Sequence, residues 1–311
     1  MSLSRLAVGL AVAIAVATPA AAKELKSVGI SVGSLGNPFF VATIKGIEAK
    51  AKEINPQAKF VNVSSDYDLN KQFTQVDNFI AAGVDVLMIN AVDPVAIEPA
   101  IKKAQAAGIV VGAFDVSAKG ADVTVMTDNV KAGAVACQYL VDHLKGKGEV
   151  LIINGPQVSS VVDRVNGCKE VFAKHPDIKI LSDNQDAKGS RDGGFSVAQS
   201  LLTRFPKVDG IFAINDPTAI GANLAAKQLG RSEFIITSVD GAPDIEAELK
   251  SGTSLIKASA SQDPYAMAGE ALVLANEVLN GKKPEKSVVL LDPRLITADN
   301  LAEYQGWTAA R

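Results

Sequence analysis

Short apolar segments alternate with longer segments of helical periodicity along most of this 311-residue chain. In the first half, the apolar segments lie at residues 27–32, 59–63, 84–90 and 109–115. Helical spacing marks residues 38–54 and 94–107, and glycine or proline tends to end such a segment before the next apolar one. Because the short segments are apolar nearly throughout, they predict strands of a parallel sheet with helices on both faces. The rhythm therefore predicts a doubly wound α/β fold.

The same rhythm returns in the second half of the chain. Its apolar segments lie at residues 149–155, 178–183, 208–216 and 234–241. Asn90 and Asn215 end predicted strands that stand 125 residues apart, and Asp115 and Asp240 repeat this match with the same offset. Two matches of residue type at one offset predict two similar α/β lobes.

Three late segments complicate a simple division into two halves. Residues 254–262 have the pattern of a strand, residues 263–281 that of a long helix, and residues 287–297 that of a further extended run. Elements of this kind could pack back on the first lobe, so that the chain crosses between the lobes several times. The pattern alone leaves that crossover open.

The N-terminus has the pattern of an export signal. Arg5 supplies a positive charge, residues 6–17 are an unbroken apolar run, and residues 20–22 offer an A-x-A cleavage site before Lys23. The run is short for a membrane span, although an uncleaved anchor is the alternative interpretation. We therefore expect residues 1–22 to be a signal peptide and the mature protein to be periplasmic.

Polar residues stand where predicted strands end. Ligands of an open parallel sheet bind beyond the carboxyl ends of its strands. The polar residues at these positions are Asn37, Asn90, Asp93, Asp115, Asn215, Asp216, Asp240 and Gln262. Asp93, Asp216 and Asp263 each precede a proline, which favours helix capping. The repeated Asn and Asp pairs lack this simple explanation, and we expect them to face one cleft from two lobes.

The predicted cleft combines two carboxylates, two carboxamides and Arg164 from a helix start. Carboxylates accept hydrogen bonds from hydroxyl groups, and carboxamides both donate and accept. This set suits a neutral polyhydroxylated ligand. A phosphate would need more cations or a glycine-rich loop, and the sequence has no P-loop and no G-x-G-x-x-G at a strand–helix junction. No nucleotide or other cofactor is therefore expected.

Catalytic patterns are missing from the sequence. His143 and His175 have the positions of solvated or capping residues in helices, and no Ser-His-Asp, H-E-x-x-H or C-x-x-C arrangement occurs. The formal net charge of −3 gives no reason to expect a nucleic-acid partner. These observations argue against an enzyme and against metal-dependent chemistry.

With these residues in view, the chain resembles the periplasmic sugar-binding proteins of the ribose/galactose-binding type, the receptors of ABC importers. The matching stretches are GNPFF (36–40), NAVDPVAI (90–97), FD (114–115), TDNVKAG (127–133), RVNG (164–167), FAINDPTAIGA (212–222), VDGAPD (239–244) and SQDP (261–264). The resemblance implies two lobes of the type I periplasmic binding protein fold, joined by a three-segment hinge. It implies an N-terminal lobe of residues 26–127 plus 263–290 and a C-terminal lobe of residues 128–262 plus 291–311.

The resemblance also implies which residues bind the ligand. The hydrogen-bonding positions are Asn37, Asn90, Asp115, Arg164, Asn215, Asp240 and Gln262, and the ring-stacking positions are Phe39 and Phe40. Ribose binders have Arg after the first Asp and Phe before the second, where this chain has Val116 and Val239. Residues 186–194 also lack the aromatic ring that the family often carries. The departures leave D-ribose, another sugar and an acyclic polyol as possible ligands.

Cys137 and Cys168 are the two cysteines of the chain. They lie in the predicted helices before and after the strand at residues 149–155, and such helices can lie side by side on one lobe. An exported chain permits a disulfide between them, and two buried free thiols are the alternative.

We expect a monomeric receptor that captures a neutral sugar or polyol and delivers it to the membrane permease of an ABC importer. It would neither insert into the membrane nor bind nucleic acid. A receptor for a chemotaxis or signalling partner is the first alternative. A sugar-responsive regulator would need a DNA-binding segment where the export signal stands, and an exported enzyme on polyols lacks its catalytic residues.

Overall fold

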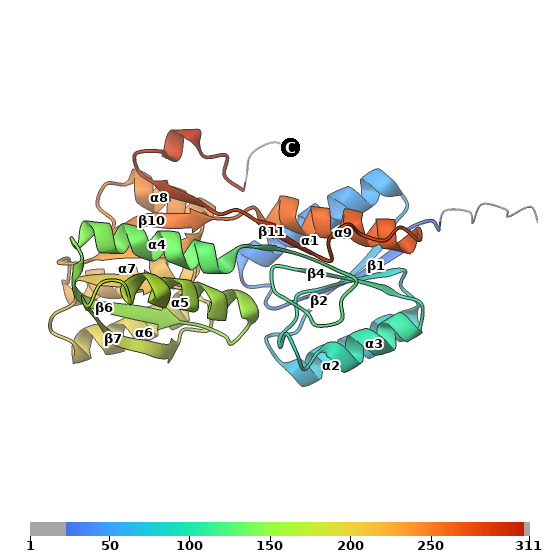
Figure 1. Ribbon diagram of the computed structural model, residues 1–311, viewed down its shortest axis with the longest axis horizontal. Coiled ribbons are helices and arrows are strands. Elements are labelled where there is room, and N and C mark those ends of the chain that lie inside the picture. Colours follow the sequence, from blue (N-terminus) through green and yellow to red (C-terminus); the bar gives the residue numbers. More distant parts are fainter. Residues whose placement is uncertain (1–22, 308–311) are drawn as a thin grey trace, which may run out of the picture.

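The structure, a computed structural model, describes residues 23–307. The predicted signal peptide at residues 1–22 lies outside the described residues. The described chain forms two α/β lobes that lie side by side, each built on one six-stranded sheet (Figure 1). The predicted fold class, two similar doubly wound lobes of the periplasmic binding protein type I, is confirmed.

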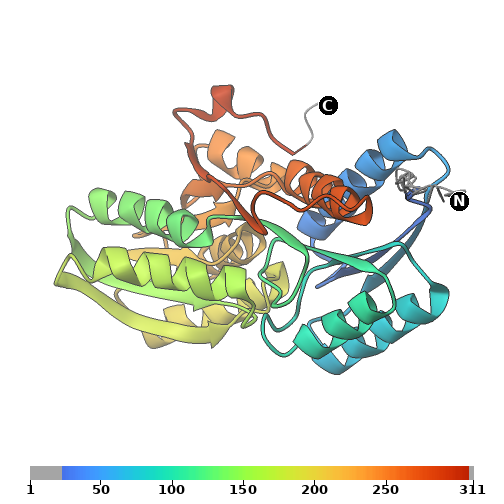
Figure 2. The ribbon, with the colours of Figure 1, turned by 45° about the vertical axis from the view of Figure 1, so that its right-hand side comes forward.

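The first sheet has the strand order β11-β5-β4-β3-β1-β2, and all its neighbours are parallel. Its strands are β1 (Ser27–Val32), β2 (Lys59–Ser64), β3 (Val86–Ile89), β4 (Val110–Phe114), β5 (Val123–Thr127) and β11 (Val288–Leu291). Its helices are α1 (Pro38–Ile54), α2 (Leu69–Ala82), α3 (Glu98–Ala106) and α9 (Pro264–Leu279). α1 packs beside α9 and α2 beside α3, and the two pairs cover opposite faces of the sheet (Figure 2).

The second sheet repeats this topology in the order β12-β10-β9-β8-β6-β7. Its strands are β6 (Lys147–Asn154), β7 (Asp177–Asp186), β8 (Gly210–Ala213), β9 (Ile235–Asp240), β10 (Ile256–Ser261) and β12 (Arg294–Thr297). Its helices are α4 (Asn129–His143), α5 (Ser159–Phe172), α6 (Arg191–Arg204), α7 (Asp216–Leu229) and α8 (Pro243–Lys250). Strand β12 differs from the others because it runs antiparallel to β10.

Three segments carry the chain from one sheet to the other. They connect β5 to α4, β10 to α9, and β11 to β12. The extended run predicted over residues 287–297 is therefore two strands, one on each sheet. The predicted lobe boundaries stay a prediction; β11 of the first sheet runs to Leu291, one residue past the boundary predicted after residue 290. A short 3-10 helix (Leu301–Glu303) follows β12.

Local signals explain several of the helix boundaries. Asn37 caps α1 through its side-chain oxygen, which accepts from the Phe39 amide, and Pro38 occupies the first helical position. This helix has the predicted bounds. Asp263 caps α9 as predicted, whereas the helix expected from residue 94 begins only at Glu98, because Asp93 caps a preceding turn instead.

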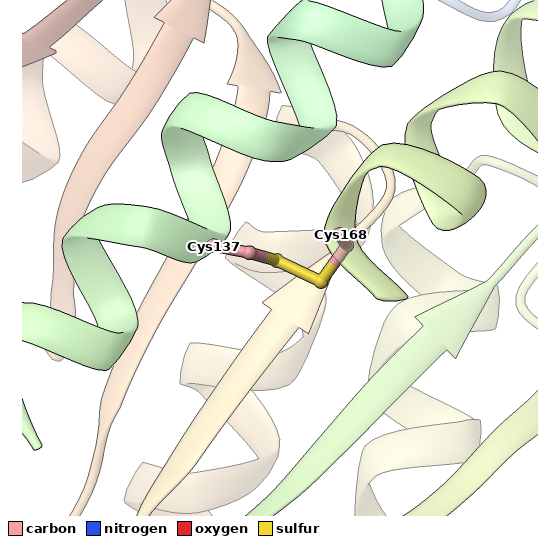
Figure 3. The surroundings of a disulfide bond; sticks show 2 residues. All are labelled: Cys137 and Cys168. Atoms are coloured by element: carbon pink, nitrogen blue, oxygen red, sulfur yellow. A yellow bond between two sulfur atoms is a disulfide. The ribbon is translucent and has the colours of Figure 1, made fainter. Parts of the chain in front are cut away.

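Helices α4 and α5 lie directly against each other on the second sheet. A Cβ atom at Gly133 would collide with the carbonyl of Arg164, and one at Gly167 with the carbonyl of Val130, so both positions need glycine for this close approach. Cys137 and Cys168 join the two helices in a disulfide (Figure 3). The predicted pairing of the cysteines is confirmed.

Candidate ligand-binding site

The carboxyl ends of the two sheets face one cavity between the lobes. All nine side chains predicted to bind ligand line this cavity. They are Asn37, Phe39, Phe40, Asn90, Asp115, Arg164, Asn215, Asp240 and Gln262. The structure therefore brings the whole predicted set together, and their roles as ligand contacts stay a proposal.

The first lobe presents Asp115, which directly follows β4. Asn90, which follows the neighbouring strand β3, donates from Nδ2 to Asp115 Oδ2 at 2.8 Å. Asp115 is 6% exposed and Asn90 is 1% exposed, so this pair is nearly removed from water. The amide leaves the remaining lone pairs of the carboxylate for hydroxyl groups in the cavity.

The second lobe presents Asp240, the last residue of β9. Its Oδ1 accepts from Gln262 Nε2 at 2.6 Å and from Arg164 at 3.3 Å. Arg164 is held in place from behind, because it also donates to the side chain of Asn129 and to the carbonyl of Ile214. The buried ion pair is thus fixed by several further hydrogen bonds, as a desolvated ion pair requires.

Backbone strain marks the same positions. Asp115 has φ 67° and Asp240 has φ 139°, in the region that favours glycine, and Tyr67 beside them has φ 58°. Residues held in such conformations cost on the order of 1 to 3 kcal/mol and cluster at functional sites. Both strained aspartates line the cavity.

Burial shifts the protonation of both carboxyl groups. Loss of water raises the pKa of Asp115 to about 6, and the nearby Arg164 cation opposes this rise while the Asp240 charge adds to it. Burial likewise raises the pKa of Asp240 to about 6, again opposed by Arg164. One cation therefore serves two desolvated carboxylates, one from each lobe.

Asp216 has a structural role that differs from the predicted helix cap. Asn215 caps α7 by accepting from the Thr218 amide, and Asp216 points into the sheet instead. Its carboxylate accepts from the hydroxyls of Ser238 and Ser259 at 2.5 and 2.7 Å. Because these serines belong to β9 and β10, Asp216 holds together the strand ends beside the cavity. Burial and the Asp240 charge raise the pKa of Asp216 well above its usual range.

Aromatic rings form one wall of the cavity. The Phe39 and Phe40 rings meet edge to face at 5.4 Å, and the Tyr67 ring lies 6.5 Å from Phe40. Phe39 and Phe40 also belong to the hydrophobic core of the first lobe and are 4% and 3% exposed. Each ring therefore carries core packing as well as cavity surface, so alanine at either position should lower stability as well as affinity.

Tyr67 was missed by the sequence prediction. It follows β2 in the sequence SSDYD, so the rule that ligands lie beyond strand ends would have included it. Its ring lies over Gly33, where a Cβ atom would stand 2.7 Å from the ring. Burial is the main cause that raises the pKa of Tyr67, and the Asp115 and Asp240 charges add to it. Beside its polar groups, the second lobe adds aliphatic surface to the same cavity, from Pro156, Val158, Val161 and Ile214.

The lobes lie close together in this conformation. The Ser117 amide of the first lobe donates to Ser159 Oγ of the second at 2.8 Å. The space left among the polar side chains is about 40 Å³, whereas ligand pockets usually measure about 300 to 1,000 Å³. A larger hollow of about 350 Å³ adjoins it and shares Asn37, Tyr67 and Gly189 with it. Entry of a ring-sized ligand therefore requires the lobes to part.

Two further findings concern residues 23–307, the part of the chain that the structure describes. None of the helices there combines the length and apolarity needed to cross a membrane. That part of the chain also contains no cluster of three His, Cys, Asp or Glu side chains arranged to hold a metal ion.

Two lobes of one topology, three crossing segments and a polar cavity between facing strand ends define a two-lobed solute-binding protein. The chain belongs to the periplasmic binding protein family, whose periplasmic binding protein domain matches residues 28–283. The predicted resemblance and the predicted receptor class are thereby confirmed.

Several relatives are similar over most of their length. A ribose import binding protein of Bacillus subtilis is 33% identical over 269 residues, 86% of each chain. A xylitol-binding protein of Mycolicibacterium smegmatis is 31% identical over 286 residues, 91% of this chain and 80% of that protein. Among solved structures, the Caulobacter myo-inositol binding protein bound to myo-inositol has a TM-score of 0.82 and 28% identity, and covers 92% of this chain and 97% of its own. These relatives are binding proteins.

Proposed function

We propose that this protein captures a neutral monosaccharide or polyol between its lobes and delivers it to the permease of an ABC importer. One observation carries the proposal: two buried carboxylates, one from each lobe, meet around a single cation. Such groups need hydroxyl donors to be satisfied in a closed cavity, and a polyol supplies several donors without bringing charge. The ligands named for the relatives, ribose, xylitol and myo-inositol, all belong to this chemical class.

Binding across the two lobes provides the mechanism. A ligand shifts a conformational equilibrium only through contacts that differ between the two states. A polyol held by Asp115 and Asp240 at once has those contacts only when the lobes are together, so binding favours closure. The closed receptor then presents surfaces from both lobes to its membrane partner. We propose that it acts as a monomer in the periplasm, after cleavage near Ala22.

The cavity surface bears on the choice of ligand. Aromatic rings line it from the first lobe only, through Phe39, Phe40 and Tyr67, while Val239 is fully buried and offers no ring from the second. Val116 likewise supplies no second cation beside Asp115. We therefore propose that the ligand stacks one apolar face on the first lobe, which suits a small furanose or an acyclic polyol as well as a pyranose.

A thermal-shift screen of pentoses, hexoses, inositols and acyclic polyols tests the proposal. A ligand at about 1,000 times its dissociation constant stabilises the folded state by about 4 kcal/mol. Asp115→Asn and Asp240→Asn should remove most of the shift, and Asp77→Asn, at an exposed position of α2 outside the cavity, serves as the control. Absence of any shift across the screen would contradict the proposal.

A further inference from the structure

The C-terminal segment after β12 contacts both lobes. It leaves the second sheet, forms the 3-10 helix at Leu301–Glu303 and returns toward the segments that connect the lobes (Figures 1 and 2). Leu301 and Tyr304 pack against the hydrophobic core of the second lobe. Trp307 packs against the core of the first lobe. The segment is therefore a fourth connection between the lobes, made by side-chain contacts.

Tyr304, which we call the anchor on the second lobe, lies beside the cavity carboxylate Asp240. Tyr304 donates its hydroxyl to the carbonyl of Gly241 at 2.8 Å. Gly241 directly follows Asp240 and has φ 73°, and a Cβ atom there would collide with the tyrosine hydroxyl. Gly306 similarly lies against the carboxylate of Glu246 on α8. Tyr304 thus supports the strained turn that carries Asp240.

Trp307, the anchor on the first lobe, packs against the cavity ring of Phe39. The Trp307 ring meets the Phe39 ring edge to face, with centroids 5.8 Å apart. Its Nε1 donates to the carbonyl of Gln262 at 2.9 Å. Gln262 belongs to the connection between β10 and α9, and its side chain donates to Asp240. Trp307 therefore touches one cavity residue on the first lobe and one in a crossing segment.

We propose that residues 299–307 form a strap that holds the lobes together and positions Phe39, Asp240 and Gln262 for the ligand. When the lobes part, Tyr304 moves with the second lobe and Trp307 with the first, so at least one of the two anchors must give way. The strap then stabilises the closed conformation before ligand binds. Trp307 and Tyr304 are positioning residues in this proposal. It concerns the lobe equilibrium, so it holds whichever ligand the cavity takes.

Distances between the lobes in unliganded protein test the strap. Spin labels at Asn78→Cys on α2 and Ser196→Cys on α6 report the separation by pulsed electron paramagnetic resonance, because both side chains are exposed and both helices lie away from β11 (Figure 1). The native cysteines are joined to each other and do not take the label. Trp307→Ala should raise the ratio of long to short distances on the order of tenfold, since it removes an aromatic pair and a hydrogen bond.

Three further variants separate positioning from general stability. Trp307→Phe keeps a ring against Phe39 and should restore most of the short-distance population, whereas Gln305→Ala, at an exposed position in the same segment, should behave as wild type. Tyr304→Phe removes only the hydroxyl and should show a smaller shift toward long distances. The proposal is overturned if wild type shows no short-distance population, or if Trp307→Ala and Tyr304→Phe leave the distribution unchanged. The measurement needs no ligand, so a negative sugar screen would not affect its outcome.

Discussion

The protonation of Asp115 and Asp240 makes ligand affinity depend on pH. Both groups have a pKa of about 6 in the unliganded protein, chiefly because they are buried. Ligand hydroxyls donate to the ionised form, so binding releases protons wherever these groups are protonated. When the pH falls from 7.5 to 5, protonation of one group with a pKa near 6 should weaken ligand affinity about tenfold. Two such groups cost up to about a hundredfold, and less where they titrate as a coupled pair around Arg164.

Folding stability should change in the opposite direction over the same range. The two carboxyl groups hold protons more tightly in the folded protein, with a pKa of about 6, than in the unfolded chain, where 3.8 applies. Their contribution to the free energy of unfolding is therefore largest below about pH 4 and is lost as the pH rises through about 6. Unliganded protein should gain stability from these groups, and lose affinity, as the pH falls from 7 to 5.

Isothermal titration calorimetry and thermal unfolding at pH 5, 6 and 7.5 check both trends. The ligand is the one found by the screen, and buffers of different ionisation enthalpy count the protons released. Asp115→Asn should remove about half of the pH dependence of affinity. Asp93→Asn is a matched control, because its amide hydrogen bonds lower the pKa of Asp93 and it titrates below this range. An affinity that stays constant from pH 7.5 to pH 5 would refute the reasoning.

Three further predictions concern single features. Replacing Cys137 and Cys168 by serine should lower the free energy of unfolding by about 2 to 4 kcal/mol in urea and leave affinity within about twofold, because the disulfide lies outside the cavity; a large loss of affinity would contradict this. Phe39→Ala should weaken binding and also cost about 3 to 5 kcal/mol of stability, and unchanged urea unfolding would contradict the core role of this ring. Trp307 is the one tryptophan of the chain and lies against Phe39, so ligand titration should shift its fluorescence emission, and an unchanged spectrum at saturation would contradict its link to the cavity.

Much of the fold follows from local sequence signals. The helix expected over residues 38–54 has those bounds, because its asparagine cap, its proline and its apolar spacing all act within a few residues. The offset between Asn90 and Asn215 correctly predicted two lobes of one topology. Strand β5, by contrast, was not recognised as a separate strand, because Thr124 and Thr127 interrupt the continuous apolar run that marked the other strands. The division of residues 287–297 into β11 and β12 depends on their pairing with β5 and β10, and β5 is far away in the sequence.

In the candidate site, too, local signals predicted some residues, whereas contacts with distant residues determine the others. Positions after strands could be predicted one by one, because the carboxyl ends of parallel strands meet at one edge of a sheet. The role of Asp216 could not, because the residue before proline has the same local signature whether it caps a helix or ties two strands together. Trp307 could not be predicted for a different reason. It stands 268 residues after Phe39, and no local pattern connects the two.

The geometry of the cavity suggests why closure and binding are coupled. When the lobes come together without ligand, Asp115 and Asp240 lose their contact with water, and Arg164 is the one cation near both. This desolvation is unfavourable, as the raised pKa values of the two groups show. A polyol relieves this cost by donating hydroxyl groups to both carboxylates, so closure becomes favourable when ligand is present. The proposed strap acts against the same cost in the unliganded protein. The free energy of closure in the unliganded protein is then the desolvation cost of the two carboxylates less the stabilisation by the strap, and ligand affinity depends on it. A weaker strap should therefore lower affinity even for a ligand that touches neither Tyr304 nor Trp307.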